Sequence, residues 1–174
     1  MSKLQVETIS HTNNTTAMTI DSSGRVSQPS VPAFRVGLTS GFDITSTNTI
    51  VEVPWNEGIS SESDNCFSQG GFSWSSGVVT VPIAGIYSFS LVARLDNLAS
   101  NTYAIMRIYK NNTHSSNKEY YIIDGNPATN YQAFTGSGIF KLSASDTVRV
   151  GAFTDNDSAY QVDADSTFSG HLIG

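Results

Sequence analysis

The sequence predicts an all-β domain, and three observations carry that prediction. From Tyr87 to Leu95, apolar side chains occupy every second position. Successive side chains of a strand point to opposite faces, so this period of two indicates a strand at the centre of a β core. Charged residues make up only 14% of the 174 residues, and Ser, Thr, Asn and Gly are plentiful. No long stretch has the three-and-four spacing of an amphipathic helix, which favours strands joined by turns.

Strand patterns recur along the chain from residue 33 onward. The central stretch, residues 77–95, is expected to turn at Pro82 and Gly85 and so to supply two strands. Residues 60–71 are predicted to form a polar loop. Further strands are predicted over residues 34–38, 50–55, 103–110, 120–123, 131–142, 147–153 and 166–173. About eight or nine strands joined by turns rich in Asn, Asp, Gly and Ser are typical of a double-sheet jelly roll or sandwich.

Residues 1–31 differ from the domain that we expect over residues 32–174. Two short apolar pieces flank a polar run, and the sequence Asp-Ser-Ser-Gly at residues 21–24 predicts a tight turn within a small hairpin. An isolated hairpin is marginal in water. This segment is therefore expected to dock on other copies of the chain, on another protein or on the body of the domain. A loosely ordered tail is the alternative.

Charge and cysteine content exclude several classes of partner. Nine Lys and Arg against fifteen Asp and Glu give a net charge of −6, so no basic patch is expected to bind nucleic acid. The single cysteine, Cys66, has no partner for an internal disulfide. The first ten residues lack the apolar run of a secretory signal, and no stretch is apolar enough for a membrane span. We expect synthesis in the cytoplasm.

The side chains that enzymes use are scattered. The chain has no G-x-S-x-G motif, Cys66 has no histidine close in sequence, and His11, His114 and His171 lie far apart. Neither a nucleophile with its base nor a zinc pair of histidines is indicated. We therefore predict a protein that is not an enzyme.

Two groups of residues are candidates for ligand contact. Oxygen-rich loops hold calcium, but the acidic group near the C-terminus lacks the pattern of an EF-hand, so solvated carboxylates and no cofactor are the favoured interpretation. This group is Asp155, Asp157, Asp163 and Asp165. Aromatic and amide side chains in exposed loops suit carbohydrate or protein ligands, and ordinary loop surface is the alternative. These residues are Tyr120, Tyr121, Asn126, Asn130 and Tyr131.

Five segments resemble C1q-like domains, which are related to the tumour-necrosis-factor ligands. GVVTVPIAGIYSFS at residues 77–90 resembles the family pattern G-x-F-x-x-P-x-x-G-x-Y-x-F-S. Residues 33–38, 105–112, 137–150 and 166–172 resemble four further family segments in the same order, so the resemblance covers residues 33–174. Ser145 stands where the family has glycine, so the turn before Asp146 is expected to depart from the usual tight one. No collagen-like stalk precedes the domain, which argues against complement and adipokine roles.

The resemblance implies a C1q/TNF-like jelly-roll sandwich that forms a homotrimer around a threefold axis. The matching motifs imply core and axis positions, for which ordinary sandwich core within one chain is the alternative. These positions are Tyr87, Phe89, Phe168, Gly170 and Leu172.

The N-terminal sequence ISHTNNTTAMTIDSSGRVSQP, residues 9–29, resembles the leader that precedes such domains in virion proteins of tailed bacteriophages. This implies a structural protein on the virion surface, as a capsid decoration or cement protein or as a short tail fibre or tip. It would stabilise the particle or contact carbohydrate or protein on the host surface. Attachment to the underlying major capsid or tail protein is assigned to Leu4, Val6, Ile9, Met18, Ile20 and Val26. A soluble carbohydrate- or protein-binding module without a virion anchor is the alternative.

Overall fold

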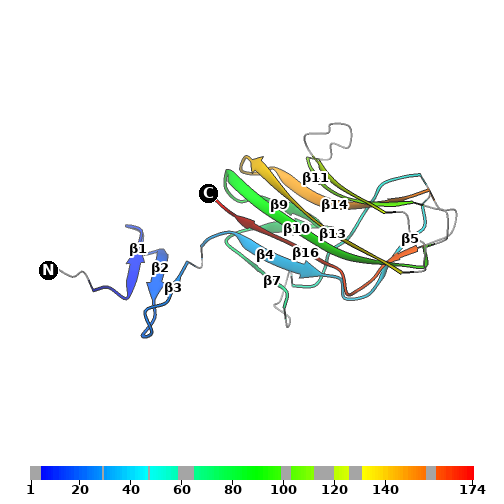
Figure 1. Ribbon diagram of the computed structural model, residues 1–174. Helices are drawn as coiled ribbons and strands as arrows, with labels where there is room; N and C mark the ends of the chain where they lie inside the picture. The colour runs from blue at the N-terminus through cyan, green and yellow to red at the C-terminus, as the bar shows by residue number, and fades with distance from the viewer. Residues whose placement is uncertain are drawn as a thin grey trace.

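The computed structural model describes residues 5–28, 30–46, 48–58, 65–98, 103–111, 120–125, 131–155 and 160–174, with the backbone alone described over 120–125. Within these ranges the chain forms strands and no helix, so no described helix is available to cross a membrane. Two antiparallel sheets face each other, and a third, small sheet lies to their N-terminal side (Figure 1). The predicted all-β sandwich is confirmed.

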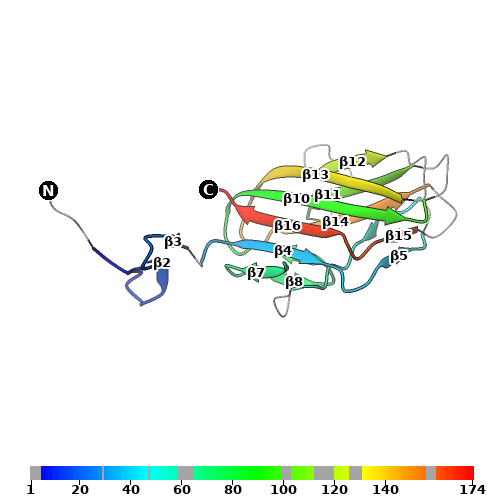
Figure 2. The same cartoon turned by 60° about the horizontal axis from the view of Figure 1, so that its bottom comes forward.

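The first sheet has the central strand β10 (Gly85–Asp96) in its middle. Its neighbours are β13 (Tyr131–Leu142) on one side and β16 (Thr167–Leu172) on the other, followed by β4 (Ala33–Gly37) and β7 (Phe67–Gln69). Figure 2 shows the order β13-β10-β16-β4-β7 across this sheet. Two short strands, β5 (Phe42–Ile44) and β15 (Tyr160–Val162), continue it at the far end of β10.

The second sheet covers the inner face of the first. Its strands run in the order β12 (Tyr120–Gly125), β11 (Ala104–Lys110), β14 (Thr147–Thr154), β9 (Val78–Thr80) and β8 (Ser73–Ser75). The two-residue strand β6 (Val51–Glu52) also pairs with β14. All the strand pairs are antiparallel.

The core lies between these sheets within one chain. Tyr87, Phe89 and Phe168 are fully buried, and the rings of Phe89 and Phe168 stack with centroids 5.9 Å apart. Gly170 leaves room for the ring of Phe89, which a Cβ at that position would meet at 2.5 Å. Leu172 is half-buried against the same cluster. All five residues expected at the core or axis therefore belong to the interior side of a single domain.

The observed strands differ from the predicted ones where strands of only three residues pair with a neighbour. The end of the predicted loop over residues 60–71 forms β7, because Phe67 to Gln69 pair with the edge of β4. Three-residue strands such as β5 and β15 were not predicted, since they are defined by their pairing partners and not by a long alternating pattern.

The turn before Asp146 is a tight turn despite the serine, which corrects the expectation from the sequence. Ser145 takes a positive φ of 71°, the conformation that glycine adopts most easily. The Asp146 amide donates to the Ser143 carbonyl at 3.1 Å, and the Ser143 amide donates to the Asp146 carboxylate at 2.7 Å. These hydrogen bonds hold the turn in the left-handed backbone conformation.

The N-terminal segment forms a sheet of three strands, β1 (Thr8–Ser10), β2 (Thr16–Ile20) and β3 (Val26–Ser27), in that order. The predicted turn at residues 21–24 joins β2 to β3, as expected. Asp21 organises it, because its Oδ1 accepts hydrogen bonds from the amides of Ser23 at 2.8 Å and Arg25 at 3.0 Å. In Figure 1 this sheet stands beside the sandwich and outside its two layers.

Candidate functional site

The outward face of the first sheet carries few charges and several exposed apolar side chains. Register places Ser88 of β10 between Ile139 of β13 and His171 of β16. Ile139 is 71% exposed, and Val92 and Ile86 on β10 are 48% and 43% exposed. We call this surface the neutral face. Its residues are Ile86, Ser88, Ser90, Val92, Thr135, Ser137, Ile139, Thr167, Ser169 and His171.

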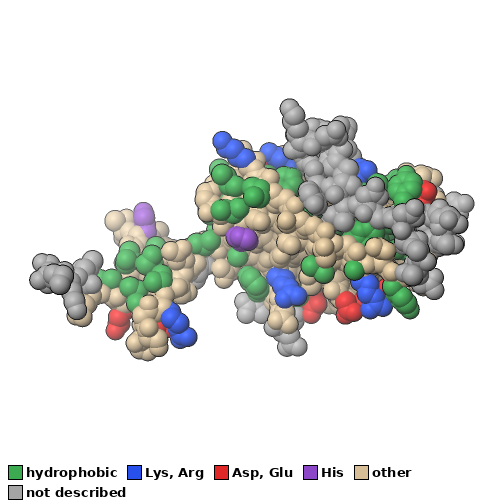
Figure 3. Space-filling view, in the orientation of Figure 1, with side chains coloured by type: hydrophobic (Ala, Val, Ile, Leu, Met, Phe, Trp, Pro, Cys, Tyr) green, Lys and Arg blue, Asp and Glu red, His purple; other side chains and the backbone are tan. Residues whose placement is uncertain are grey.

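Charged side chains lie at the margins of the neutral face. Lys141 is opposite Ile86 at one end, and Arg35 is opposite Ser169 on the adjoining strand β4. At the other end Arg94 pairs with acidic residues. Figure 3 views this face and shows mostly uncharged surface, with Asp and Glu gathered along the lower rim and Lys and Arg around the edge. A surface with an uncharged centre and a polar rim has the anatomy of a protein–protein interface.

The outward face of the second sheet is different because it carries ion pairs. Arg149 contacts Glu52 at 2.6 Å, with the guanidinium 5.8 Å from the centre of the Tyr109 ring. Burial, together with the neighbouring Glu52, raises the pKa of Tyr109 well above its usual range. At the end of β11 Lys110 contacts Asp146 at 2.8 Å. Charged pairs held in fixed positions make this face a poorer candidate for a subunit contact than the neutral face.

Sequence reasoning missed the exposed apolar residues of the neutral face, although a signal was present. On β13 the buried Phe134, Phe140 and Leu142 share one parity, and Ile139 is a large apolar residue on the other. Val92 is likewise an apolar residue on the outward parity of β10. An apolar residue on the solvent parity of a strand indicates a surface that becomes covered.

The acidic residues considered as calcium ligands do not form one cluster. Asp165 and Asp163 lie 3.1 and 3.8 Å from the guanidinium of Arg94, which also donates to Asp96 at 2.8 Å. The hydrogen bond to Asp96 raises the pKa of Arg94, and the other nearby carboxylates contribute to the rise.

The other members of that group do not extend it. The Asp155 carboxylate accepts a 2.8 Å hydrogen bond from the Tyr103 amide, and Asp157 lies outside the described residues. Over the described ranges no three His, Cys, Asp or Glu side chains are placed to hold a metal.

The candidate ligand-binding residues are spread over both sheets. Tyr131 begins β13, is 61% exposed, and has its ring centre 5.1 Å from the guanidinium carbon of Arg94. Tyr120 and Tyr121 begin β12, the edge strand of the second sheet, where only the backbone is described. Asn126 and Asn130 lie outside the described residues. Tyr131 is therefore the one member of the group whose side chain is described at an open surface.

The N-terminal sheet holds the second candidate surface. Register pairs Ile9 with Met18 and Ile20 with Val26, so these four apolar side chains share one face. Ile9 is 46% and Val26 is 55% exposed.

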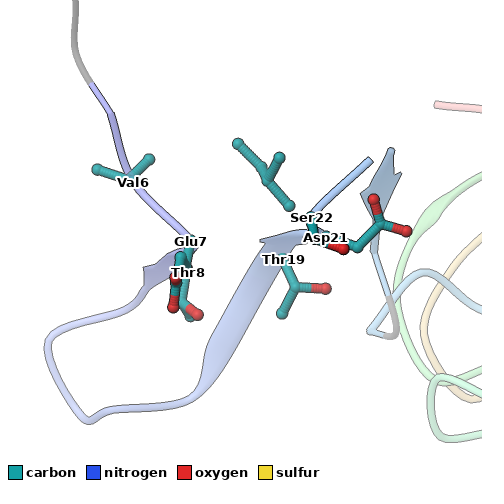
Figure 4. Close-up of a pocket in the computed structure, with 7 residues that line it drawn as sticks. Val6, Glu7, Thr8, Thr19, Asp21 and Ser22 are labelled. Carbon is teal, nitrogen blue, oxygen red and sulfur yellow. The ribbon is translucent and has the colours of Figure 1, made fainter. Parts of the chain in front are cut away.

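An open groove adjoins this sheet. It runs between residues 6–8 and 19–22 and includes Val6 and Ile20 (Figure 4). Leu4, the remaining residue assigned to attachment, lies outside the described residues.

Comparison with known proteins agrees with the observed topology. A C1q domain profile matches residues 33–173. No curated protein sequence gives a significant match. Among solved structures, murine APRIL at pH 8.0 shares 15% identity and a TM-score of 0.56, covering 81% of this chain and 97% of that one. The globular domain of a zebrafish complement 1qA protein shares 18% identity and a TM-score of 0.54, covering 83% of this chain and 98% of that one. At these identities the likeness to the solved structures concerns the fold.

Proposed function

Because the chain belongs to the C1q domain family, we propose that it is a non-enzymatic binding protein that works as a homotrimer. The neutral face is the observation that carries this proposal. Ile139, Val92 and Ile86 expose apolar surface on this face, and the Ser and Thr side chains between them carry no charge that would resist burial. In a closed ring of three, the neutral face of each copy meets a neighbour in a head-to-tail contact.

We further propose that residues 1–31 attach this trimer to the surface of a tailed-phage virion, on the major capsid protein or on a tail protein. The separate N-terminal sheet and the leader that resembles those of phage virion proteins support this assignment. Residues 32–174 would then face outward. There they would stabilise the particle or contact host carbohydrate or protein through exposed side chains such as Tyr131.

Light scattering behind a sizing column tests the homotrimer. Three copies of the 18.7 kDa chain give about 56 kDa, and that mass is the expected result. A monomer over the whole concentration range would refute the trimer.

Virion attachment is tested separately, by adding the full chain or residues 32–174 to particles that lack the protein. We expect only the full chain to bind. Equal binding of both forms would refute attachment through residues 1–31. Ligand binding by a protein that never associates with particles would favour a soluble binding module.

A further inference from the structure

One face of the N-terminal sheet is apolar, and Ile9 and Val26 on it are 46% and 55% exposed. Ile9, Met18, Ile20 and Val26 share that face through the pairs Ile9–Met18 and Ile20–Val26. Among the described strands, β1, β2 and β3 form hydrogen bonds only with one another. Figure 3 shows green side chains clustered on this part of the molecule. We call this surface the apolar N-terminal face.

The opposite face of the same sheet is polar. Thr8 pairs with Thr19, and Thr19 pairs with Ser27, so hydroxyl side chains occupy the other parity. A sheet with one polar and one apolar face is the pattern of a layer packed on a core. Two of the three strands, with three and two residues, are at or below the short end of the usual range, so this sheet buries little apolar surface by itself. The apolar N-terminal face therefore needs a cover.

The connection to the sandwich indicates which molecule supplies the cover. The carbonyl of Pro32 accepts a 2.9 Å hydrogen bond from the Leu172 amide, so the chain enters β4 beside the end of β16. At this same end, Ile173 and Ile86 are joined by a 2.7 Å backbone hydrogen bond and are 54% and 43% exposed. The exposed apolar surface of the neutral face thus continues to the end of the domain from which the N-terminal sheet extends.

The charged pair of the segment lies in the turn, away from the four apolar side chains. Asp21 and Arg25 contact each other at 2.7 Å in the turn between β2 and β3. The four side chains of the apolar N-terminal face are hydrocarbon or thioether, with no charge to select an oppositely charged protein. A second and a third copy of the same face match this chemistry.

We propose that the three N-terminal sheets of a trimer pack their apolar faces together and form a stem on the threefold axis. This inference rests on the homotrimer proposed above. The outer edge of β1, which pairs with no other described strand, remains on the outside of the stem, where a particle protein can contact it.

Hydrogen exchange on the full chain tests the stem, with Met18→Gln compared against Thr19→Gln. Both positions are half-buried on β2 and lie on opposite faces, so the two variants introduce the same side chain toward and away from the proposed contact. In the wild type we expect amides of residues 16–20 to exchange about 100-fold more slowly than in an unstructured chain. Met18→Gln should remove most of that protection while the mass stays trimeric, and Thr19→Gln should change it by less than about threefold.

The outcomes separate the stem from the trimer. A wild-type trimer whose β2 amides exchange at unstructured rates would overturn the stem and leave the homotrimer standing. Protection that arises only after binding to a particle would assign the apolar N-terminal face to the particle protein and would also overturn the stem. Equal loss of protection in both variants would show that the apolar N-terminal face is not the contact surface, and would overturn the stem. A wild-type monomer would remove the homotrimer and the stem together.

Discussion

Ile139 provides the sharpest test of the neutral face. Full burial of an isoleucine side chain contributes about 1.5–3 kcal/mol. Ile139 is 71% exposed in the single chain, so covering it in a trimer would contribute about 1–2 kcal/mol per copy. Replacement by serine should therefore cost about 3–6 kcal/mol per trimer, which corresponds to about 10²–10⁴ in the dissociation constant.

The measurable result is a shift in the concentration at which trimers dissociate. For three monomers in equilibrium with one trimer, that midpoint varies as the square root of the dissociation constant, so Ile139→Ser should raise it about 10- to 100-fold. Light scattering on a dilution series measures the midpoint. Ile105→Ser is the control in the other sheet, because Ile105 lies on the outward parity of β11 and is partly buried there. An unchanged midpoint in Ile139→Ser, or an equal shift in Ile105→Ser, would refute the assignment of the contact to the neutral face.

Three further predictions concern the stability of the domain and are checked by unfolding experiments. Ser145→Gly should stabilise it by about 0.5–1 kcal/mol, because the positive φ of 71° is easier for glycine; a lower midpoint of thermal unfolding would contradict this. Gly170→Ala should destabilise it by about 1–3 kcal/mol, since the added Cβ would meet the Phe89 ring at 2.5 Å, and an unchanged midpoint of denaturant unfolding would show that the ring can move aside. Burial alone would raise the pKa of Asp146, but hydrogen bonds from Asn111 and other neighbours lower it from 3.8 to about 2. The carboxylate therefore contributes up to about 2 kcal/mol that is fully present above pH 5 and is lost as the pH falls toward 2, and Asp146→Asn should flatten the stability profile over that window.

The candidate surfaces were only partly predictable. The N-terminal turn could be read from Asp21 to Gly24, because its side-chain-to-backbone hydrogen bonds are local. Apolar residues on the solvent parity of β10 and β13 were a local signal for the neutral face, but its assembly could not be predicted, because it depends on Ser88 lying opposite Ile139, 51 positions further along the chain. Nor did composition predict that Asp163 and Asp165 form ion pairs with Arg94, about 70 residues away in sequence. Distant pairing decides both arrangements.

The sequence by itself determined the all-β class, the long strands and the buried side of the central strand. Alternation over Tyr87 and Phe89 is a local property, and burying one parity of a strand follows from its geometry. Only the tertiary structure decided the three-residue strands, the left-handed turn at Ser145 and the make-up of the outward face. The short strands and the outward face depend on register with distant segments, and the amide of Ser145 donates a 2.9 Å hydrogen bond to the carbonyl of the distant Val81. A local pattern carries no information about which distant strand will lie beside it.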